Sequence, residues 1–240
     1  MPKLLDRWTV YPHEPLRQVD DGIWTADGDI PMPLGNFPRR MTVVRLRGGR
    51  LAIWSAIALR EPDMAAIEAE GTPAFLIVPG PAHRLDSRIW KERYPELRVI
   101  APPGAAKAVR EAVPVDATAD ILDDPDVDFT LVQGTAGREA ALTIRRAGGS
   151  TIVCNDVIAH VRHPHGIGAR AMARLMGFGA FAPQVPRPIK RMMIEDKATL
   201  AAQFRDWACT PNLKRVIMSH GDPIEDAPAV ALERLAAQLA

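Results

Sequence analysis

Side chains able to bind a metal ion follow three apolar runs of the sequence. The runs cover residues 74–78, 151–154 and 215–219, and each is predicted to form a buried strand. The metal-capable residues that follow these runs are His83, Asp86, Asp156 and His220. Sheet proteins build binding sites just beyond the ends of their strands, and imidazole and carboxylate groups are zinc ligands. A single such residue can equally cap a helix or form a turn, so the prediction rests on their combination.

Three further histidines, His160, His163 and His165, lie in the loop after Asp156. A His-x-His spacing does not place two rings on one helical face, which would need a spacing of four residues. The rings could still chelate a metal from a loop. The alternative interpretation is that they are solvated histidines of a basic segment. His13 lies in a proline-flanked segment and is expected in an exposed loop.

Several other catalytic motifs are absent from the sequence. There is no Gly-x-Ser-x-Gly segment, which argues against a hydrolase with a nucleophile elbow, and no Gly-x-x-x-x-Gly-Lys-Ser/Thr phosphate loop. Cys154 lies in an apolar run and is expected in the core rather than as a nucleophile. Cys209 is the only other cysteine, so no disulfide framework is expected.

The elements that must position these residues alternate between strand-like and helix-like runs. Gly48-Gly49 and Gly148-Gly149 each separate two short apolar runs and predict hairpins. Strands are predicted over residues 22–27, 41–47, 51–57, 74–78, 98–101, 127–132, 139–146, 151–154 and 215–219. Helices are predicted over residues 62–70, 85–94, 104–112, 168–176, 197–207 and 226–239. Proline clusters predict connections at residues 12–15, 31–38, 79–81, 102–103 and 183–188.

This order of elements predicts one mixed sheet, or two sheets, covered by helices. The first strands are expected to be antiparallel because they surround a hairpin. No stretch of the chain is a linker long enough to separate domains, so a single domain over residues 1–240 is predicted.

Four segments resemble the metallo-β-lactamase fold superfamily, and more closely a branch of it described as a domain of unknown function. Segments between residues 41 and 57 resemble the opening antiparallel strands, and segments between residues 78 and 104 resemble the first metal-binding loop with its helix and next strand. Residues 152–156 are similar to the strand whose final aspartate bridges the metals, and residues 216–222 resemble the last strand with its metal-binding histidine. The resemblance implies an α/β protein with a four-layer αββα sandwich, in which two mixed sheets are flanked by helices.

The resemblance also implies a metal site formed by His83, Asp156 and His220. Asp86 would be the catalytic carboxylate that positions water, or a fourth ligand. Three ligands can hold one zinc ion and leave a position open for water.

Two departures from the family pattern argue against the usual two-metal centre. Catalytic members carry a His-x-His-x-Asp-His run on the first loop, whereas this chain has Arg84 where the related branch often has a second histidine. Arginine stays protonated and offers no lone pair to a metal. The family's Gly-His-Thr-x-Gly-type loop corresponds to residues 134–137 here, Gly-Thr-Ala-Gly, which contain no histidine.

Two hypotheses of different classes follow. The first is a mononuclear, zinc-dependent hydrolase that acts on a small, anionic or carbonyl-bearing molecule. The second is a non-catalytic, metal-free member of the fold that binds a ligand or a partner. Bound metal in the purified protein separates them.

The composition excludes several classes of protein. The chain has 240 residues, 47% of them hydrophobic and 25% charged, which is too apolar for a disordered protein. Thirty Lys and Arg against 29 Asp and Glu leave no basic excess, so no nucleic-acid partner is expected. No apolar run approaches a membrane span and no signal peptide is recognised, so a cytoplasmic protein without a membrane partner is expected.

Charge is nevertheless unevenly distributed along the chain. Residues 111–128 contain seven acidic residues and no Lys or Arg, and residues 157–194 contain six Lys and Arg and no acidic residue. One interpretation is two solvated segments that face each other, and the other is a basic lid over a site for an anionic ligand. Met172, Leu175 and Met176 share a predicted helix face in the basic segment, which is expected in the core, or else as a pocket wall or homodimer patch.

Overall fold

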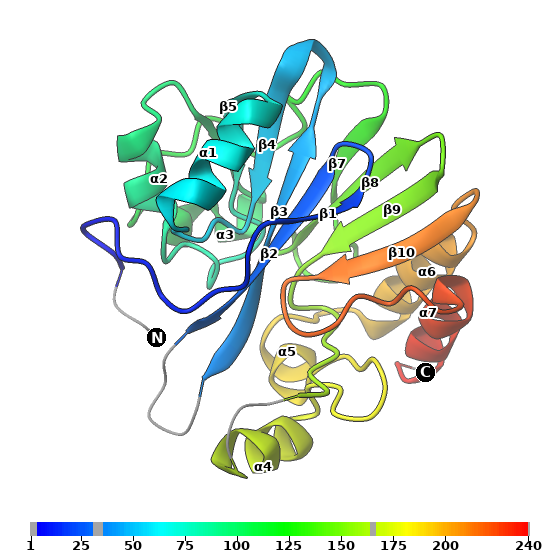
Figure 1. Ribbon diagram of the computed structural model, residues 1–240. Helices are drawn as coiled ribbons and strands as arrows, with labels where there is room; N and C mark the ends of the chain where they lie inside the picture. Colours follow the sequence, from blue (N-terminus) through cyan, green and yellow to red (C-terminus); the bar gives the residue numbers. More distant parts are fainter. Residues whose placement is uncertain (1–3, 31–35, 164–166, 240) are drawn as a thin grey trace.

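Two β-sheets pack face to face in the computed structural model, which describes residues 4–30, 36–163 and 167–239 (Figure 1). Within these residues the first sheet has six strands in sequential order. They are β1 (Arg17–Asp20), β2 (Ile23–Ile30), β3 (Phe37–Arg45), β4 (Arg50–Trp54), β5 (Thr72–Ile77) and β6 (Arg98–Ile100). The strands from β1 to β4 are antiparallel, as expected, whereas β4, β5 and β6 are parallel.

The second sheet has four strands in the order β10-β9-β8-β7. They are β7 (Val127–Leu131), β8 (Ala140–Arg146), β9 (Gly149–Cys154) and β10 (Leu213–Met218). The β7–β8 and β8–β9 pairs are antiparallel, and β10 pairs with β9 in parallel. Both sheets are therefore mixed.

The hydrophobic core forms three stacked layers, because successive apolar side chains of a strand point to opposite faces of its sheet. In β4, Ile53 packs toward the helices outside the first sheet and Trp54 packs between the sheets. In β9, Cys154 packs toward the helices outside the second sheet and Val153 packs between the sheets. Successive side chains of a strand point to opposite faces, so a strand that is apolar at every position must be covered on both sides. The expected burial of Cys154 in the core is confirmed.

Helices cover the outer face of each sheet. On the first sheet these are α1 (Glu61–Glu70), α2 (Ser87–Arg93) and α3 (Pro103–Val109), and on the second they are α6 (Lys197–Ala208) and α7 (Pro228–Ala237). Two further helices, α4 (Ile167–Met176) and α5 (Arg187–Met192), lie at the lower end of the molecule in Figure 1. The predicted αββα sandwich is confirmed. No helix of the described residues is long and apolar enough to cross a membrane.

The sequence-based predictions missed β1 and α5 and misjudged several prolines. Pro38 lies inside β3, Pro103 begins α3 and Pro188 lies in the first turn of α5, although each belongs to a cluster predicted to be a connection. Pro38 pairs with Asp29 of β2 but with no residue of β4, because the pairing of β3 with β4 begins at Thr42. The N–H that Pro38 lacks therefore interrupts no hydrogen bond between β3 and β4. In the first helical turn a proline is favourable, since the N–H it lacks has no helical partner.

An ion pair between Asp20 of β1 and Arg215 of β10 links the two sheets. Burial acts to raise the pKa of Asp20, but the Arg215 hydrogen bond and the Asp21 backbone N–H outweigh it, so this pKa lies below its ordinary value. We expect Asp20→Asn to lower the free energy of unfolding by about 1 kcal/mol at pH 7. Because a carboxyl with a depressed pKa stabilises only when ionised, the difference should shrink as the pH falls below the ordinary carboxyl value of 3.8 and through the lower pKa of folded Asp20. Urea unfolding of both proteins at pH 7 and at successively lower pH values tests this, and a difference that does not shrink as the pH falls would contradict it.

Candidate metal centre

The side chains of His83, Asp156 and His220 meet at one edge of the sandwich. Asp156 Oδ1 lies 3.2 Å from His83 Nε2 and 3.0 Å from His220 Nε2, and the two Nε2 atoms are 3.3 Å apart. Within the described residues this is the one group of three or more such side chains whose ligand atoms all lie within 4.8 Å of one another. The fold thus brings His83 and His220, which are 137 positions apart in the sequence, to the same site as Asp156, as the sequence predicts.

Strand direction explains why Asp156 and His220 meet, and the packing of the two sheets brings His83, which follows β5 of the other sheet, to them. The strands β5, β9 and β10 end at Ile77, Cys154 and Met218, shortly before the three residues of the cluster. The parallel pairing of β9 with β10 places their ends side by side, with Cys154 in register with Met218. The carboxyl ends of parallel strands share one edge of a sheet, and polar side chains beyond them can meet there.

The hydrogen bonds of His220 leave a lone pair that faces a carboxylate. His220 Nδ1 lies 2.7 Å from the carbonyl oxygen of Pro38, and a carbonyl can only accept, so Nδ1 must carry the hydrogen. In neutral His220 the Nε2 atom is then an acceptor, 3.0 Å from the acceptor oxygen of Asp156. Two acceptors repel at this distance unless a proton or a metal ion lies between them. The donor set therefore fits a metal ion that prefers nitrogen and oxygen ligands, such as zinc.

Ser55 holds the ring of His83 from the other side. Its Oγ lies 2.8 Å from His83 Nδ1, directly after the end of β4. Ser55 has a φ of 53°, a left-handed conformation that is unusual for a residue other than glycine. When Nδ1–H donates to the Ser55 oxygen, the lone pair of His83 is on Nε2 and points at the cluster. No pattern in the sequence pointed to Ser55, because nothing in an isolated serine marks it as a partner of a distant histidine.

Burial and the contacts within the cluster together set the protonation of His83 and Asp156. It lowers the pKa of His83, and the neighbouring Asp156 carboxylate offsets this only in part. Burial acts to raise the pKa of Asp156, but attraction by His83 and the contacts with His220 outweigh it and keep this pKa below its ordinary value. A neutral imidazole and an ionised carboxylate at neutral pH are the forms that bind a divalent metal.

Glu139, to which no sequence pattern pointed, binds the backbone of Asp156. It is fully buried, and its Oε1 atom accepts from the backbone N–H of Asp156 at 3.1 Å and from Asn155 Nδ2 at 3.4 Å. Its Oε2 atom has no hydrogen-bond partner among the described residues. Burial, together with the Asp156 charge, raises the pKa of Glu139 well above its ordinary value. Glu139 is thus expected to be uncharged where Asp156 is ionised.

Replacing Glu139 by glutamine should test this protonation state in the metal-free protein. The folded state keeps a proton that the unfolded state loses above about pH 4.5, so the native protein loses stability as the pH rises through that range. Glutamine has the same shape and does not titrate, so the stability of Glu139→Gln relative to the native protein should increase from pH 5 to pH 8. Glu139→Ala serves as the contrast and should lose about 1–3 kcal/mol, since it leaves two buried donors unpaired. Urea unfolding at both pH values gives the measurement, and parallel pH profiles for native protein and Glu139→Gln would contradict the assignment.

The structure gives Asp86, the predicted catalytic carboxylate, a different set of partners. It is buried, forms an ion pair with Arg39 and accepts the Ala58 N–H at 3.0 Å. Burial raises the pKa of Asp86, and Arg39 opposes this effect. Asp86 lines the same cavity as the cluster but is not one of its converging ligands. Its catalytic role stays a prediction.

A cavity of about 310 Å³ opens onto the three cluster residues. From the basic segment its walls include Phe178, Pro188, Ile189 and Met192, and none of the described Lys or Arg residues of that segment. The segment thus covers the site with apolar side chains, whereas Arg39 and Arg84 bring positive charge from other parts of the chain. The described ion pairs of the acidic segment go to Arg84 and Arg145, not to the basic segment.

The other histidines stay outside the cluster. His160 supports the loop of His220 through its backbone: its N–H donates to the His220 carbonyl at 3.2 Å, and its own carbonyl accepts the Asp222 N–H at 2.8 Å. His163 is exposed, and His165 lies outside the described residues. The prediction that His13 is exposed was wrong for its ring, because the side chain is 1% exposed. Its Nε2 atom accepts a hydrogen bond from the Arg60 N–H at 3.1 Å.

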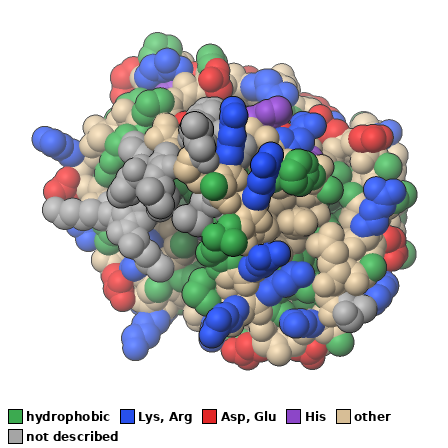
Figure 2. Space-filling view, turned by 90° about the horizontal axis from the view of Figure 1, so that it is seen from below, with side chains coloured by type: hydrophobic (Ala, Val, Ile, Leu, Met, Phe, Trp, Pro, Cys, Tyr) green, Lys and Arg blue, Asp and Glu red, His purple; other side chains and the backbone are tan. Residues whose placement is uncertain are grey.

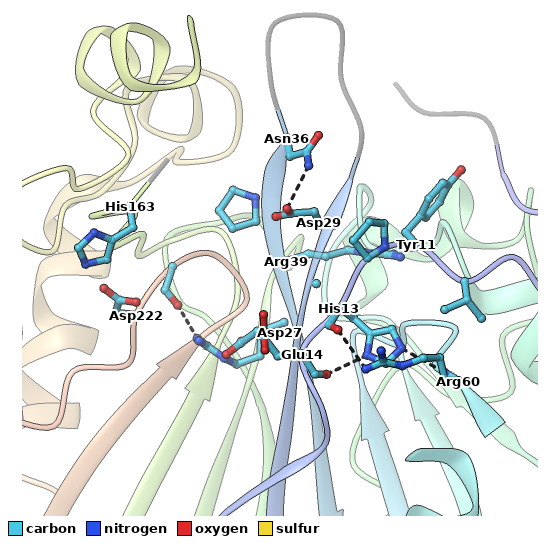
Figure 3. Close-up of a pocket in the computed structure, with 16 residues that line it drawn as sticks. Tyr11, His13, Glu14, Asp27, Asp29, Asn36, Arg39, Arg60, His163 and Asp222 are labelled. Carbon is cyan, nitrogen blue, oxygen red and sulfur yellow. Dashed lines mark hydrogen bonds and ion pairs between the residues drawn. The ribbon is translucent and has the colours of Figure 1, made fainter. Parts of the chain in front are cut away.

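A larger hollow of about 690 Å³ lies beside this cavity, and Figure 3 shows its lining. None of the three cluster residues lines it. Many of its polar groups already bind one another: Asn36 Nδ2 donates to Asp29 at 3.1 Å, and Arg60 donates to the His13 carbonyl at 3.2 Å (Figure 3). The smaller cavity, where the ligand atoms converge, is therefore the candidate site.

The departures noted in the sequence persist in the structure. Arg84 forms an ion pair with Glu111 and donates to the Ala108 carbonyl. The loop of residues 134–137 forms a turn, in which Gly134 and Gly137 have φ values of 79° and 64°. Neither position adds a metal ligand to the described cluster.

No protein-family model and no curated protein sequence matches the chain. Solved structures are nevertheless similar over nearly its whole length. The DIM-1 metallo-β-lactamase exposed to ceftazidime has a TM-score of 0.64 at 13% identity and covers 95% of this chain and 100% of its own. A metallo-β-lactamase from Erythrobacter litoralis with β-mercaptoethanol in the active site has a TM-score of 0.61 at 14% identity, with 93% and 96% covered. The mono-zinc form of the FIM-1 enzyme from Pseudomonas aeruginosa has a TM-score of 0.58 at 13% identity, with 94% and 96% covered. The chain therefore has the metallo-β-lactamase fold.

Proposed function

We propose that the protein is a hydrolase that uses one zinc ion held by His83, Asp156 and His220. The observation that carries the proposal is the convergence of three ligand atoms whose lone pairs face one another. The mono-zinc form of a structural neighbour supports a single ion in this fold. Bound zinc would supply a water of lowered pKa and polarise a carbonyl or phosphoryl oxygen.

The chain's own residues orient the ligands and shape the substrate site. The Pro38 carbonyl holds His220 in the tautomer that frees Nε2, and the Ser55 hydroxyl orients the His83 ring and can accept from its Nδ1–H when Nε2 binds the metal. The apolar cavity wall, which includes Phe178 and Ile189, keeps bulk water away. The cavity volume of about 310 Å³ suits a small substrate.

Arg39 is the group we assign to recognition of a substrate oxygen. It lines the cavity, and its guanidinium pairs there with Asp86. Its charge is balanced by Asp86, so the pair offers a directed donor with little net charge. A carbonyl or anionic oxygen would satisfy this donor.

Metal analysis of protein purified without chelator is the decisive experiment. We expect about one zinc per chain, and hydrolysis of small ester or phosphoester substrates that a chelator abolishes and added zinc restores. Absence of bound zinc, together with no uptake of added zinc, would overturn the proposal.

Replacing Ser55 by alanine should weaken zinc binding about tenfold, because partners that orient a metal-binding histidine typically contribute 10–100-fold to affinity. Competition with a chromophoric chelator measures the affinity. The metal-free variant should keep its circular dichroism spectrum, which shows that the fold is intact. An unchanged zinc affinity would contradict a positioning role for Ser55.

A second candidate function is binding of a ligand or partner without metal. The observation that favours it is the small ligand set, since Arg84 and residues 134–137 contribute no ligand where the family resemblance leads one to expect histidines. A protein that binds no zinc yet is stabilised by a small molecule dependent on Arg39 would support it.

A further inference from the structure

The most exposed large apolar side chains of the described residues come from one stretch of chain. They are Phe181, Leu175 and Met192, which are 80%, 66% and 63% exposed. Leu175 belongs to α4, Phe181 to the loop that follows and Met192 to the end of α5. Burying side chains of this size would be favourable, so a cluster of them on the surface indicates a contact with an apolar partner.

Cationic side chains surround these apolar residues. Arg170, Arg174, Arg187, Lys190 and Arg191 belong to the same stretch, and residues 157–194 contain no Asp or Glu. None of the five forms an ion pair with a described carboxylate, whereas many other arginines of the described chain do. Figure 2 shows this end of the molecule, with blue side chains around green ones in the middle and red ones toward the rim. We call residues 170–192 of α4, the loop and α5 the α4–α5 face.

Three of these cations line one hollow of about 510 Å³ together with Phe181. The guanidinium carbon of Arg174 lies over the Phe181 ring, 5.2 Å from its centroid. Arg187 donates to the Leu175 carbonyl at 3.1 Å. No acidic side chain of the described residues lines the hollow. Burial lowers the pKa of Lys190, and the charges of Lys197 and Arg187 add to this effect. An anion placed here would relieve that repulsion.

We propose that the α4–α5 face docks on a membrane surface that contains anionic phospholipids. Phe181 and Leu175 would enter the boundary between headgroups and acyl chains, and Arg174, Arg187 and Lys190 would bind headgroup phosphates. This pairing of apolar and cationic side chains is what an interfacial site requires. A nucleic acid would satisfy the cations but leave Leu175 and Met192 in water.

Docking would also bring the candidate metal centre to the lipid surface. Met192 lies on the α4–α5 face and at the same time lines the cavity above His83 and His220. The sequence-based expectation of no membrane partner rested on the absence of a spanning segment, and interfacial docking needs none. The proposal does not depend on bound metal.

Sedimentation of the full chain with vesicles tests the proposal. We expect binding to vesicles of phosphatidylcholine mixed with phosphatidylglycerol, weak binding to phosphatidylcholine alone, and loss of binding at high salt. Each cation near an anionic surface contributes about fivefold, so Arg174→Gln, Arg187→Gln and Lys190→Gln combined should weaken binding about a hundredfold. The matched control changes Arg98, Lys107 and Arg110 to glutamine, three exposed cations of β6 and the α3 region, and should bind nearly as well as the native protein.

A second variant, Leu175→Ser with Phe181→Ser, separates apolar insertion from charge. It should lose most of the binding at moderate salt while keeping its fold, because both side chains are exposed. Equal binding to the two kinds of vesicle, or equal losses in the two triple variants, would overturn the proposal. Stabilisation by inorganic phosphate without vesicle binding would assign the face to a free anion, and a dimer that this variant dissociates would assign it to a second copy. Either outcome would also overturn the proposal.

Discussion

Zinc binding should be lost when Asp156 is replaced by asparagine. The Asp156 carboxylate lies between His83 and His220, and it is the one anionic ligand of the cluster. Removing groups that merely orient a ligand typically costs 10–100-fold in metal affinity, so removing the ligand's charge should cost more than about a hundredfold. Chelator competition measures the affinity, and any zinc-dependent hydrolysis should disappear with it.

Asp222→Asn is the matched control for this experiment. Asp222 follows the end of β10 much as Asp156 follows β9, but its carboxylate pairs with Arg162 and is not part of the cluster. The control should keep the zinc affinity of the native protein. If Asp156→Asn retained native affinity, the metal site would be assigned to the wrong residues. If both variants lost affinity equally, the loss would reflect the loops and not the ligand.

Gly221→Ala should destabilise the protein by about 3 kcal/mol or more and weaken metal binding as well. Gly221 has a φ of 90°, and a Cβ atom there would lie 2.1 Å from the His160 carbonyl oxygen. The strained backbone and the overlap both oppose the alanine. Its neighbour His220 would have to move, because the His160 backbone holds this loop in place. Thermal unfolding and zinc titration give the two readouts.

Gly148→Ala controls for the loss of a glycine. The nearest atom to a Cβ at that position is Asp20 Oδ1 at 3.7 Å, an ordinary contact. This variant should unfold at close to the native temperature and bind zinc normally. Native-like stability of Gly221→Ala would contradict the tight contact between the His160 and His220 loops.

The sequence by itself predicted one mixed sheet or two sheets covered by helices, and its resemblance to the metallo-β-lactamase fold implied the sandwich and the three residues that converge in it. The runs that became β5 and β9 are buried at most positions, so each strand must be covered on both faces, and this requirement is local to the sequence. Polar residues just beyond the strand ends indicated a site there, and the family resemblance singled out His83, Asp156 and His220 as the residues that would meet. Their role as metal ligands remains a proposal that the experiments above test.

Only the tertiary structure decided what surrounds those residues. Ser55 and Glu139 acquire their roles because β4 and β8 bring them beneath side chains 28 and 17 residues away in sequence, and no local pattern encodes such a contact. Asp86 follows His83 closely, as a catalytic carboxylate would, yet the packing of β3 places Arg39 against it, and it is not one of the converging ligands of the cluster. The basic segment was recognisable from its composition, but which of its side chains turn inward depends on how α4 and α5 pack on the sheet edge. Spacing along the chain limits where a side chain can go, whereas its partners are set by packing between distant elements.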